Sequence, residues 1–182
     1  MKKVFLFWAL LAVIVAACNT EQMKYGQGGR NACQYVKEQV PGLRDDIETI
    51  EVINEDSLLG DIGLTFDEVT LAKSGAEFSQ GRISADKYRA IIDSISNDAT
   101  DVYYSWKYST VVNDSLKTLS KYDGKWRKVY TVRVTMKSGT TMEPRVLMDN
   151  DGVKPYMMER DMDKRIEDFT QKIIEAQRML YF

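Results

Sequence analysis

The 182-residue sequence contains no histidine. Histidine is the usual general base near neutral pH and a common zinc ligand, so its absence excludes Ser-His-Asp and Cys-His catalysis and His-ligated zinc sites. The chain has only two cysteines, which is too few for a disulfide framework. Its formal net charge of −2 lacks the basic excess that nucleic-acid binding requires.

Common catalytic and nucleotide-binding motifs are also missing. The chain has no G-x-S-x-G nucleophile elbow, no P-loop and no G-x-G-x-x-G fingerprint. The glycine-rich segment 26–29 lacks the downstream lysine and the preceding strand of a phosphate-binding loop. We therefore expect no cofactor and no metal ion.

The longest apolar run lies at the N-terminus. Two lysines precede the uncharged residues 4–18, and polar residues follow directly. This order is typical of a secretory signal peptide. The run is shorter than the roughly 20 residues that a membrane-spanning helix needs.

The run ends in Val15-Ala16-Ala17-Cys18, which resembles the lipobox of bacterial lipoproteins. In that family the precursor is cut before the cysteine, whose sulfur receives a diacylglycerol and whose amine is acylated. The resemblance implies a signal peptide over residues 1–17 and a lipid-anchored protein of the cell envelope. By the sorting rule known best in enteric bacteria, Asn19 implies export to the outer membrane. An ordinary signal peptide with a chance cysteine, or an uncleaved anchor, is the alternative.

Residues 19–30 are polar and include three glycines. Together with the lipidated Cys18 they are predicted to form a flexible tether. Folded structure should begin near Asn31, and the remaining length suits a single globular domain over residues 31–182.

The spacing of apolar residues predicts mainly helices in the first half of this domain. Spacing near 3.6 residues and capping residues predict helices over 31–40, over 65–78 and from residue 84 or 86 through Ile95. Pro41-Gly42 should end the first helix. A β-rich stretch predicts a strand over 46–54.

After residue 100 the spacing changes to two. This alternation predicts half-buried strands over 102–112 and 126–136, joined by a short strand at 116–119 or by a long loop. A three-residue turn over 138–140 sets Met136 opposite Met142 and Val132 opposite Val146, because that register buries the apolar set.

The C-terminal segment is predicted to be an amphipathic helix, with acids at its start and bases near its end. Its apolar residues are spaced four and three apart: Met162, Ile166, Phe169, Ile173, Ala176 and Leu180. We expect this helix to pack on the sheet, and binding to a partner is the alternative.

The predicted fold class is α+β: an antiparallel β-meander of three to five strands with helices packed on one face and a C-terminal amphipathic helix. A helix followed by an antiparallel sheet is similar to cystatin-like and nuclear-transport-factor-like domains. The extra helices between the first strand and the meander depart from both families.

Most side chains that could act in catalysis or metal binding have a structural explanation. Cys33 has no histidine to activate it and is predicted to be a half-buried helical residue. The segment 149–152 lacks the acids of an EF-hand loop and predicts a turn. The acidic groups beside turns and at helix starts suit capping better than catalysis: Asp45-Asp46, Glu55-Asp56, Asp61, Asp149/Asp151 and Asp161/Asp163.

Charge is distributed unevenly along the chain. Residues 41–70 carry nine acids against one arginine, and residues 107–137 carry eight bases against two acids. In the predicted register Arg133 faces Arg145 on the outer face of the sheet, and like charges directly opposite are unfavourable. The other bases expected on that face are Arg127, Lys137 and Lys107. Either the protein neutralises them through Glu48, Glu51 or Glu143, or an external anion does, such as an acidic glycan, an envelope phosphate or an acidic partner.

The sequence thus favours a non-enzymatic, lipid-anchored envelope protein that presents a binding or assembly domain. Expected partners are the membrane, through the N-terminal lipid, and an envelope protein or acidic glycan, but not nucleic acid. One alternative is a carboxylate-dependent hydrolase of envelope polysaccharide, with two carboxylates about 5–10 Å apart and one raised pKa. Another is an accessory subunit with an exposed apolar patch.

Overall fold

The computed structural model describes residues 24–40, 44–60 and 62–181. The predicted signal peptide, Cys18, the helix stop at Pro41-Gly42 and Asp61 lie outside the described residues. The chain divides into two compact units: residues up to Asp56 with Lys128–Tyr156, and Ser57–Arg127 with the residues from Met157 onward. We call them the sheet unit and the helical unit. The predicted single domain over 31–182 is thus divided between two units.

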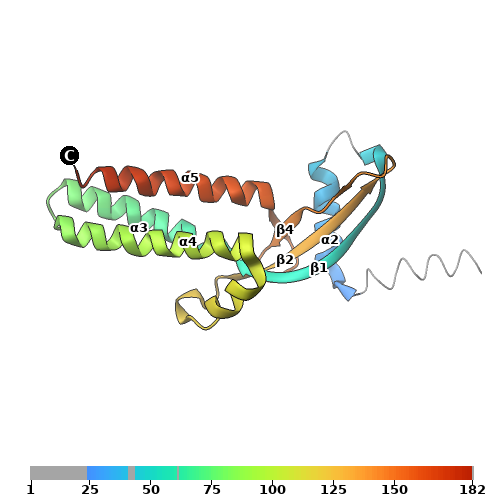
Figure 1. Cartoon of the computed structure of the whole chain (residues 1–182), viewed down its shortest axis with the longest axis horizontal. Helices are drawn as coiled ribbons and strands as arrows, with labels where there is room; N and C mark the ends of the chain where they lie inside the picture. The colour runs from blue at the N-terminus through green and yellow to red at the C-terminus, as the bar shows by residue number, and fades with distance from the viewer. Residues whose placement is uncertain (1–23, 41–43, 61, 182) are drawn as a thin grey trace, which may run out of the picture. The chain divides into compact units, whose positions relative to one another are not determined.

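The strands form a single sheet with the order β1-β2-β4-β5, and β3 also pairs with β2 (Figure 1). Both β3 and β4 run antiparallel to β2. The predicted α+β class with an antiparallel sheet is therefore confirmed. The strands are β1 (Ile47–Leu59), β2 (Trp126–Met136), β3 (Thr141–Met142), β4 (Arg145–Met148) and β5 (Pro155–Met158).

In the sheet unit, the helix α2 (Gly26–Gln39) packs on the sheet, and the short 3-10 helix η1 (Arg44–Asp46) precedes β1. Alternate residues of β2 face α2, as predicted for that strand. The core of this unit consists of Ala32, Val36, Tyr130, Val132, Val134, Met136, Val146 and Met148. Its apolar side chains come from one face of α2 and one face of the sheet, so burial of the helix face holds the two together.

The helix α2 begins at Gly26, inside the segment predicted to be a flexible tether. Gly28 is buried so closely that an added Cβ would lie 2.2 Å from the Gly152 carbonyl oxygen, an approach that only glycine allows. The Tyr25 ring packs edge-on against the Tyr130 ring, with 6.0 Å between centroids. The tether prediction is therefore wrong for residues 25–30.

The hairpin between β2 and β3 differs from the predicted register by two residues. Val134 pairs with Met142, and Tyr130 rather than Val132 pairs with Val146. The turn closes at Met136, whose N–H donates to the Thr140 carbonyl at 2.8 Å, and Gly139 in the turn has a φ of +83° that glycine favours. A register shift of two residues leaves every side chain on the same face of the sheet, so the predicted core face is unchanged.

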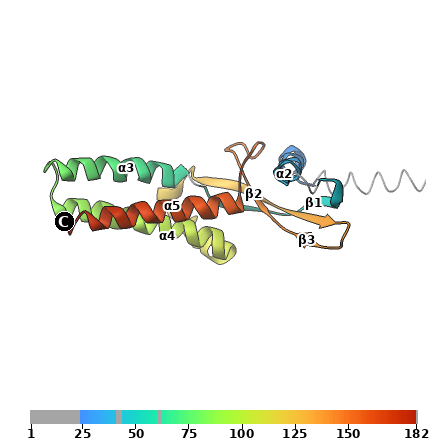
Figure 2. The ribbon, with the colours of Figure 1, turned by 90° about the horizontal axis from the view of Figure 1, so that it is seen from above.

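The helical unit contains α3 (Ile62–Ser79), α4 (Ala85–Leu116), the 3-10 helix η2 (Ser120–Tyr122) and α5 (Glu159–Arg178). The helices α3, α4 and α5 run alongside one another and contact each other pairwise (Figure 2). The principal contacts of α5 are with α4 and α3, whereas the sequence analysis placed it on the sheet. Its predicted buried face is confirmed for Met162, Ile166, Phe169, Ile173 and Ala176. Within the described ranges, no helix combines the length and the apolar character needed to cross a membrane.

The largest error concerns residues 102–112, which continue α4 instead of forming a strand. Val102 and Trp106 are buried, which agrees with a helix and with a strand, because positions four apart lie on one side of either element. Tyr104 and Tyr108 are 43% and 61% exposed, although alternation predicts them to be buried. Ser105 is fully buried, although alternation places it outside. Of the two alternatives for the connection, the short strand at 116–119 is wrong, since α4 ends at Leu116 and η2 follows.

Side chains of α4 complete the hydrogen bonding of the last residues of β1. The Leu59 N–H donates to Ser105 Oγ at 3.0 Å, and Trp106 Nε1 donates to the Leu59 carbonyl at 2.8 Å. The Ser105 hydroxyl donates to Asn113 Oδ1 at 2.7 Å, and Asn113 Nδ2 donates to the Ser57 carbonyl at 3.3 Å. Because β1 is the outermost strand, α4 supplies here the bonds that a neighbouring strand would otherwise make.

We expect Asn113→Ala to destabilise the protein by about 2–3 kcal/mol, because it leaves buried partners unsatisfied. The melting temperature should fall by about 5–10 °C, measured by far-UV circular dichroism. The matched control is Asp114→Ala at the adjacent exposed position, which should change stability by less than about 0.5 kcal/mol. Equal melting temperatures for the two variants would contradict a stabilising role of the network.

Candidate functional site

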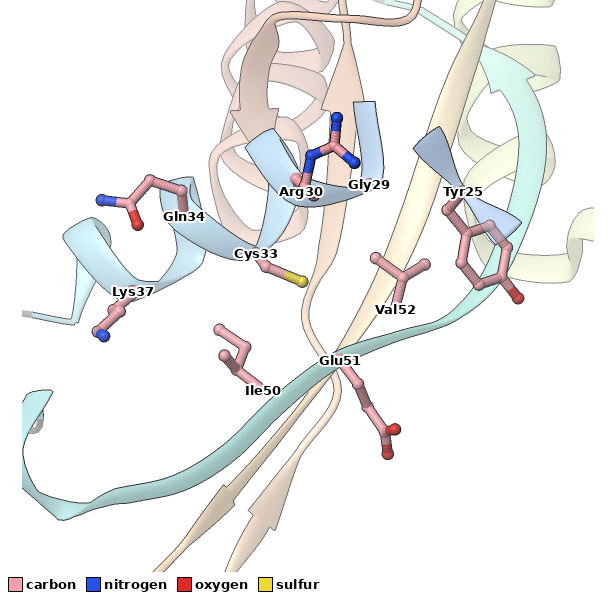
Figure 3. A pocket seen from close by; sticks show the side chains of 9 residues that line it. All are labelled: Tyr25, Gly29, Arg30, Cys33, Gln34, Lys37, Ile50, Glu51 and Val52. Carbon is pink, nitrogen blue, oxygen red and sulfur yellow. The ribbon is translucent and has the colours of Figure 1, made fainter. Parts of the chain in front are cut away.

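A pocket of about 260 Å³ lies between α2 and β1 in the sheet unit (Figure 3). We call it the helix-side pocket. The side chains of Ile50 and Val52 point toward α2, whereas Glu51 between them points away, as alternation along a strand requires. It is lined by Tyr25, Gly29, Arg30, Cys33, Gln34, Lys37, Ile50, Glu51 and Val52. Its floor is apolar and its rim is polar.

Gly29 and Cys33 both line the pocket, because positions four apart lie on one side of a helix. Gly29 is buried, and Cys33 is partly buried. The adjacent positions Ala32 and Val36 face the core instead. One side of α2 therefore packs in the core through Ala32 and Val36, and the adjacent side lines the pocket through Gly29 and Cys33.

Cys33 is the one thiol that borders this pocket. Burial raises its pKa to about 11, and the Glu51 carboxylate adds to this effect. At neutral pH the thiol is therefore protonated, which removes its nucleophilic form. Cys33 contributes a small apolar surface to the pocket rather than reactivity.

Three cations border this region without an acidic partner among the described residues. Arg30 and Lys37 are exposed at the rim, and Lys24 lies over the Tyr25 ring, 4.9 Å from its centroid. Other bases of this unit have close carboxylates: Lys128 Nζ lies 2.8 Å from Glu55 Oε1 and Arg133 Nε 2.8 Å from Glu143 Oε1. The rim of the helix-side pocket thus carries positive charge that the described residues do not neutralise.

A second pocket of about 220 Å³ lies next to the first. We call it the outer pocket, and it is lined by Lys24, Tyr25, Glu51, Val52, Ile53 and Arg133. Three of these residues, Tyr25, Glu51 and Val52, also line the helix-side pocket. The two pockets therefore adjoin at the middle of β1.

The five bases predicted to share one outer sheet face do not all do so. Arg145 lies opposite Thr131 rather than Arg133, because of the register shift. Lys107 belongs to α4 and pairs with Asp163 at 2.9 Å, and Arg127 is buried and donates to the Gly124 and Trp126 carbonyls. Lys137 Nζ donates to the Asp45 carbonyl.

Carboxylates of the sheet unit neutralise Arg133, which was one of the two expected outcomes. Its Nε bonds Glu143 as described above, and its Nη1 lies 3.9 Å from Glu51 Oε1. Anion binding by Arg133 and Arg145 stays a prediction, but the directly opposed pair on which it rested is not formed.

One carboxylate of the helical unit has the raised pKa that a hydrolase would need. Burial and the nearby Asp98 raise the pKa of Asp67 to about 6. However, Asp98 and Asp101 both accept hydrogen bonds from Tyr122 Oη and ion-pair with Lys121 Nζ at 2.7 and 3.1 Å. These bonds attach η2 to α4, so the second carboxylate is engaged in structure.

The predicted turn at residues 149–152 is confirmed. The Val153 and Lys154 N–H groups donate to Asp149 Oδ1 at 3.0 and 3.1 Å, and these bonds lower the pKa of that carboxyl. In the described part of the chain, no group of three or more cysteine or acidic side chains is arranged to hold a metal ion.

Sequence reasoning missed the residues of the pocket that lie before Asn31. Tyr25, Gly29, Ala32 and Val36 follow one another at helical spacing, so the signal was present once Gly29 is counted as a buried position. The three glycines concealed it, because glycine-rich polar segments are typical of linkers.

No family model, no curated protein and no solved structure matches this chain.

We expect alkylation of Cys33 by iodoacetamide to accelerate nearly tenfold per pH unit from pH 7.5 to 9.5 without levelling, because its pKa is about 11. Glu51→Gln should speed the reaction a few-fold at pH 8.5, since it removes a nearby negative charge. Glu48→Gln, at an exposed position of the same strand, is the control and should leave the rate unchanged. A plateau below pH 9 would contradict the raised pKa.

Proposed function

We propose that this protein is a lipid-anchored protein of the bacterial cell envelope, located in the outer membrane as Asn19 implies, and that it binds a partner without catalysing a reaction. The observation that carries the proposed binding is the helix-side pocket, with its apolar floor, its protonated thiol and a cationic rim that no described carboxylate neutralises. A pocket of this kind suits a ligand that combines apolar and acidic groups.

The position of the pocket in the chain supports a role close to the membrane. Tyr25 follows Cys18 by seven positions, and seven residues span at most about 25 Å when fully extended. If Cys18 carries acyl chains, the pocket is held within that distance of the lipid. Its ligand would then be a molecule exposed at the membrane surface.

The rival function, a hydrolase of envelope polysaccharide, has weaker support. The carboxylate with a raised pKa, Asp67, neighbours an aspartate that is already bonded to Tyr122 and Lys121. The pocket between α2 and β1 has a single carboxylate, Glu51, and its side chain points away from the floor. Paired carboxylates on either side of a cleft are what such a reaction needs.

The anchor is tested by Cys18→Ala in the producing bacterium. We expect the variant to stay unprocessed or to be released, because the lipobox cysteine is the residue that carries the lipid. Partition of the wild-type protein and the variant into a detergent phase measures the difference. Cys33→Ala is the matched control and should partition as the wild-type protein does. Equal partition of Cys18→Ala would overturn the lipoprotein assignment.

Occupation of the pocket is tested by the reactivity of Cys33 in intact envelopes. Once Cys18 is lipidated, Cys33 is the one remaining thiol. We expect it to alkylate at least tenfold more slowly in envelopes than in the purified, detergent-solubilised protein at the same pH. The double variant Cys33→Ser/Ser138→Cys, with its thiol in the exposed hairpin turn, should react equally in both. Equal rates for Cys33 would contradict a bound partner.

A further inference from the structure

The strand β1 has a free edge over part of its length. It is the outermost strand of the sheet, so one side of its backbone has no neighbouring strand among the described residues. On this side of the strand, Tyr25 Oη donates to the Ile53 carbonyl at 3.3 Å. The stretch from Ile47 to Val52 is therefore open to pairing.

The hydrogen bonds around β1 identify which residues face the free edge. The Asp46 carbonyl accepts from the Lys137 N–H, so this even-numbered position faces β2. The Ile53 carbonyl faces the other way, toward Tyr25. Because backbone groups alternate along a strand, Ile47, Thr49 and Glu51 direct their N–H and C=O groups to the open edge.

The two pockets flank this edge on opposite faces of the sheet. The helix-side pocket receives the side chains of Ile50 and Val52, and the outer pocket contains Arg133, which pairs with Glu51 on the face away from α2. A strand added to β1 would send successive side chains alternately to the two faces. Main-chain pairing combined with pockets for alternate side chains is how proteins recognise extended peptides.

The chemistry of the pockets specifies the side chains of such a peptide. The helix-side pocket has an apolar floor of Ile50 and Val52. The outer pocket contains Lys24, which has no acidic partner among the described residues, and Arg30 and Lys37 add positive charge at the other rim. The complementary peptide alternates apolar residues with acidic ones.

We infer that the partner bound at this site is an extended segment of another envelope protein, with alternating apolar and acidic residues, which adds as a strand to the free edge of β1 beside Thr49 and Glu51. The inference rests on the proposed function, because it names the ligand of the same pocket. A lipid headgroup would share the negative charge but would not use the backbone groups of β1.

The test measures binding of a fluorescein-labelled decamer of alternating valine and glutamate to the mature lipoprotein in detergent, by fluorescence anisotropy. Thr49→Pro removes an edge-facing N–H, and proline is tolerated at such positions of edge strands. We expect it to weaken binding at least tenfold. Thr49→Val keeps the N–H and should bind within twofold of the wild-type protein. A valine–lysine decamer should not bind.

A second measurement places the change in the peptide, so it does not depend on the folding of a variant. N-methylation of one alternate set of amides should abolish binding, and methylation of the other set should be tolerated, because only one set faces β1. Equal effects of the two sets, or equal binding by Thr49→Pro and Thr49→Val, would overturn strand addition. So would failure of the valine–glutamate decamer to bind at millimolar concentration.

The outcomes separate this inference from the proposed function. If Cys33→Phe, which fills the helix-side pocket, abolishes decamer binding while Thr49→Pro does not, the pocket is a binding site but strand addition is wrong. If phosphatidylglycerol vesicles compete with the decamer and bind Thr49→Pro normally, the ligand is a lipid headgroup and the inference fails. If Cys33 is unprotected in envelopes, the proposed function itself fails.

Discussion

The fold depends on how the backbone polar groups at the edge of β1 are satisfied. A buried N–H or C=O group without a partner costs free energy comparable to a lost hydrogen bond. At Ser57 and Leu59 the side chains of Ser105, Trp106 and Asn113 supply hydrogen-bond partners on the side away from β2. A helix can place these three groups together because its turns repeat every 3.6 residues. These bonds stabilise the helical state of the chain after residue 100, although its sequence alternates like a strand.

The same requirement is met differently near the start of β1. Tyr25 donates one hydrogen bond to Ile53, and it is part of the first turn that leads into α2. Gly28 and Gly29 let that turn approach closely, so α2 lies over the sheet and closes the helix-side pocket. The remaining edge groups from Ile47 to Glu51 lie beside two pockets of different polarity.

Local ion pairs neutralise most of the basic segment, and they explain why the candidate site lies elsewhere. Arg133 pairs with Glu143, Lys128 with Glu55 and Lys107 with Asp163. Exposed pairs of this kind contribute about 0–1 kcal/mol each, so they reduce repulsion more than they stabilise the fold. The sequence predicted that Glu48, Glu51 or Glu143 neutralises Arg133, and this is confirmed for Glu51 and Glu143. It could not show that Arg30 and Lys37, which have no acidic partner among the described residues, belong to one helix beside a pocket, because that helix begins in a segment that is typical of a linker.

By itself the sequence determined the features that depend on local periodicity. The α+β class, the strand over 126–136, the capped start of α4 after Ser84 and the buried face of α5 all follow from spacing and capping, and all are confirmed. The resemblance of residues 15–18 to a lipobox also depends on adjacent residues alone, and it stays a prediction. Only the tertiary structure decided whether residues 102–112 form a helix or a strand, because Val102 and Trp106 satisfy both periods. It also decided the hairpin register, the helical state of Gly28 and Gly29, and the pairing of each charge, since these depend on contacts between residues distant in the chain.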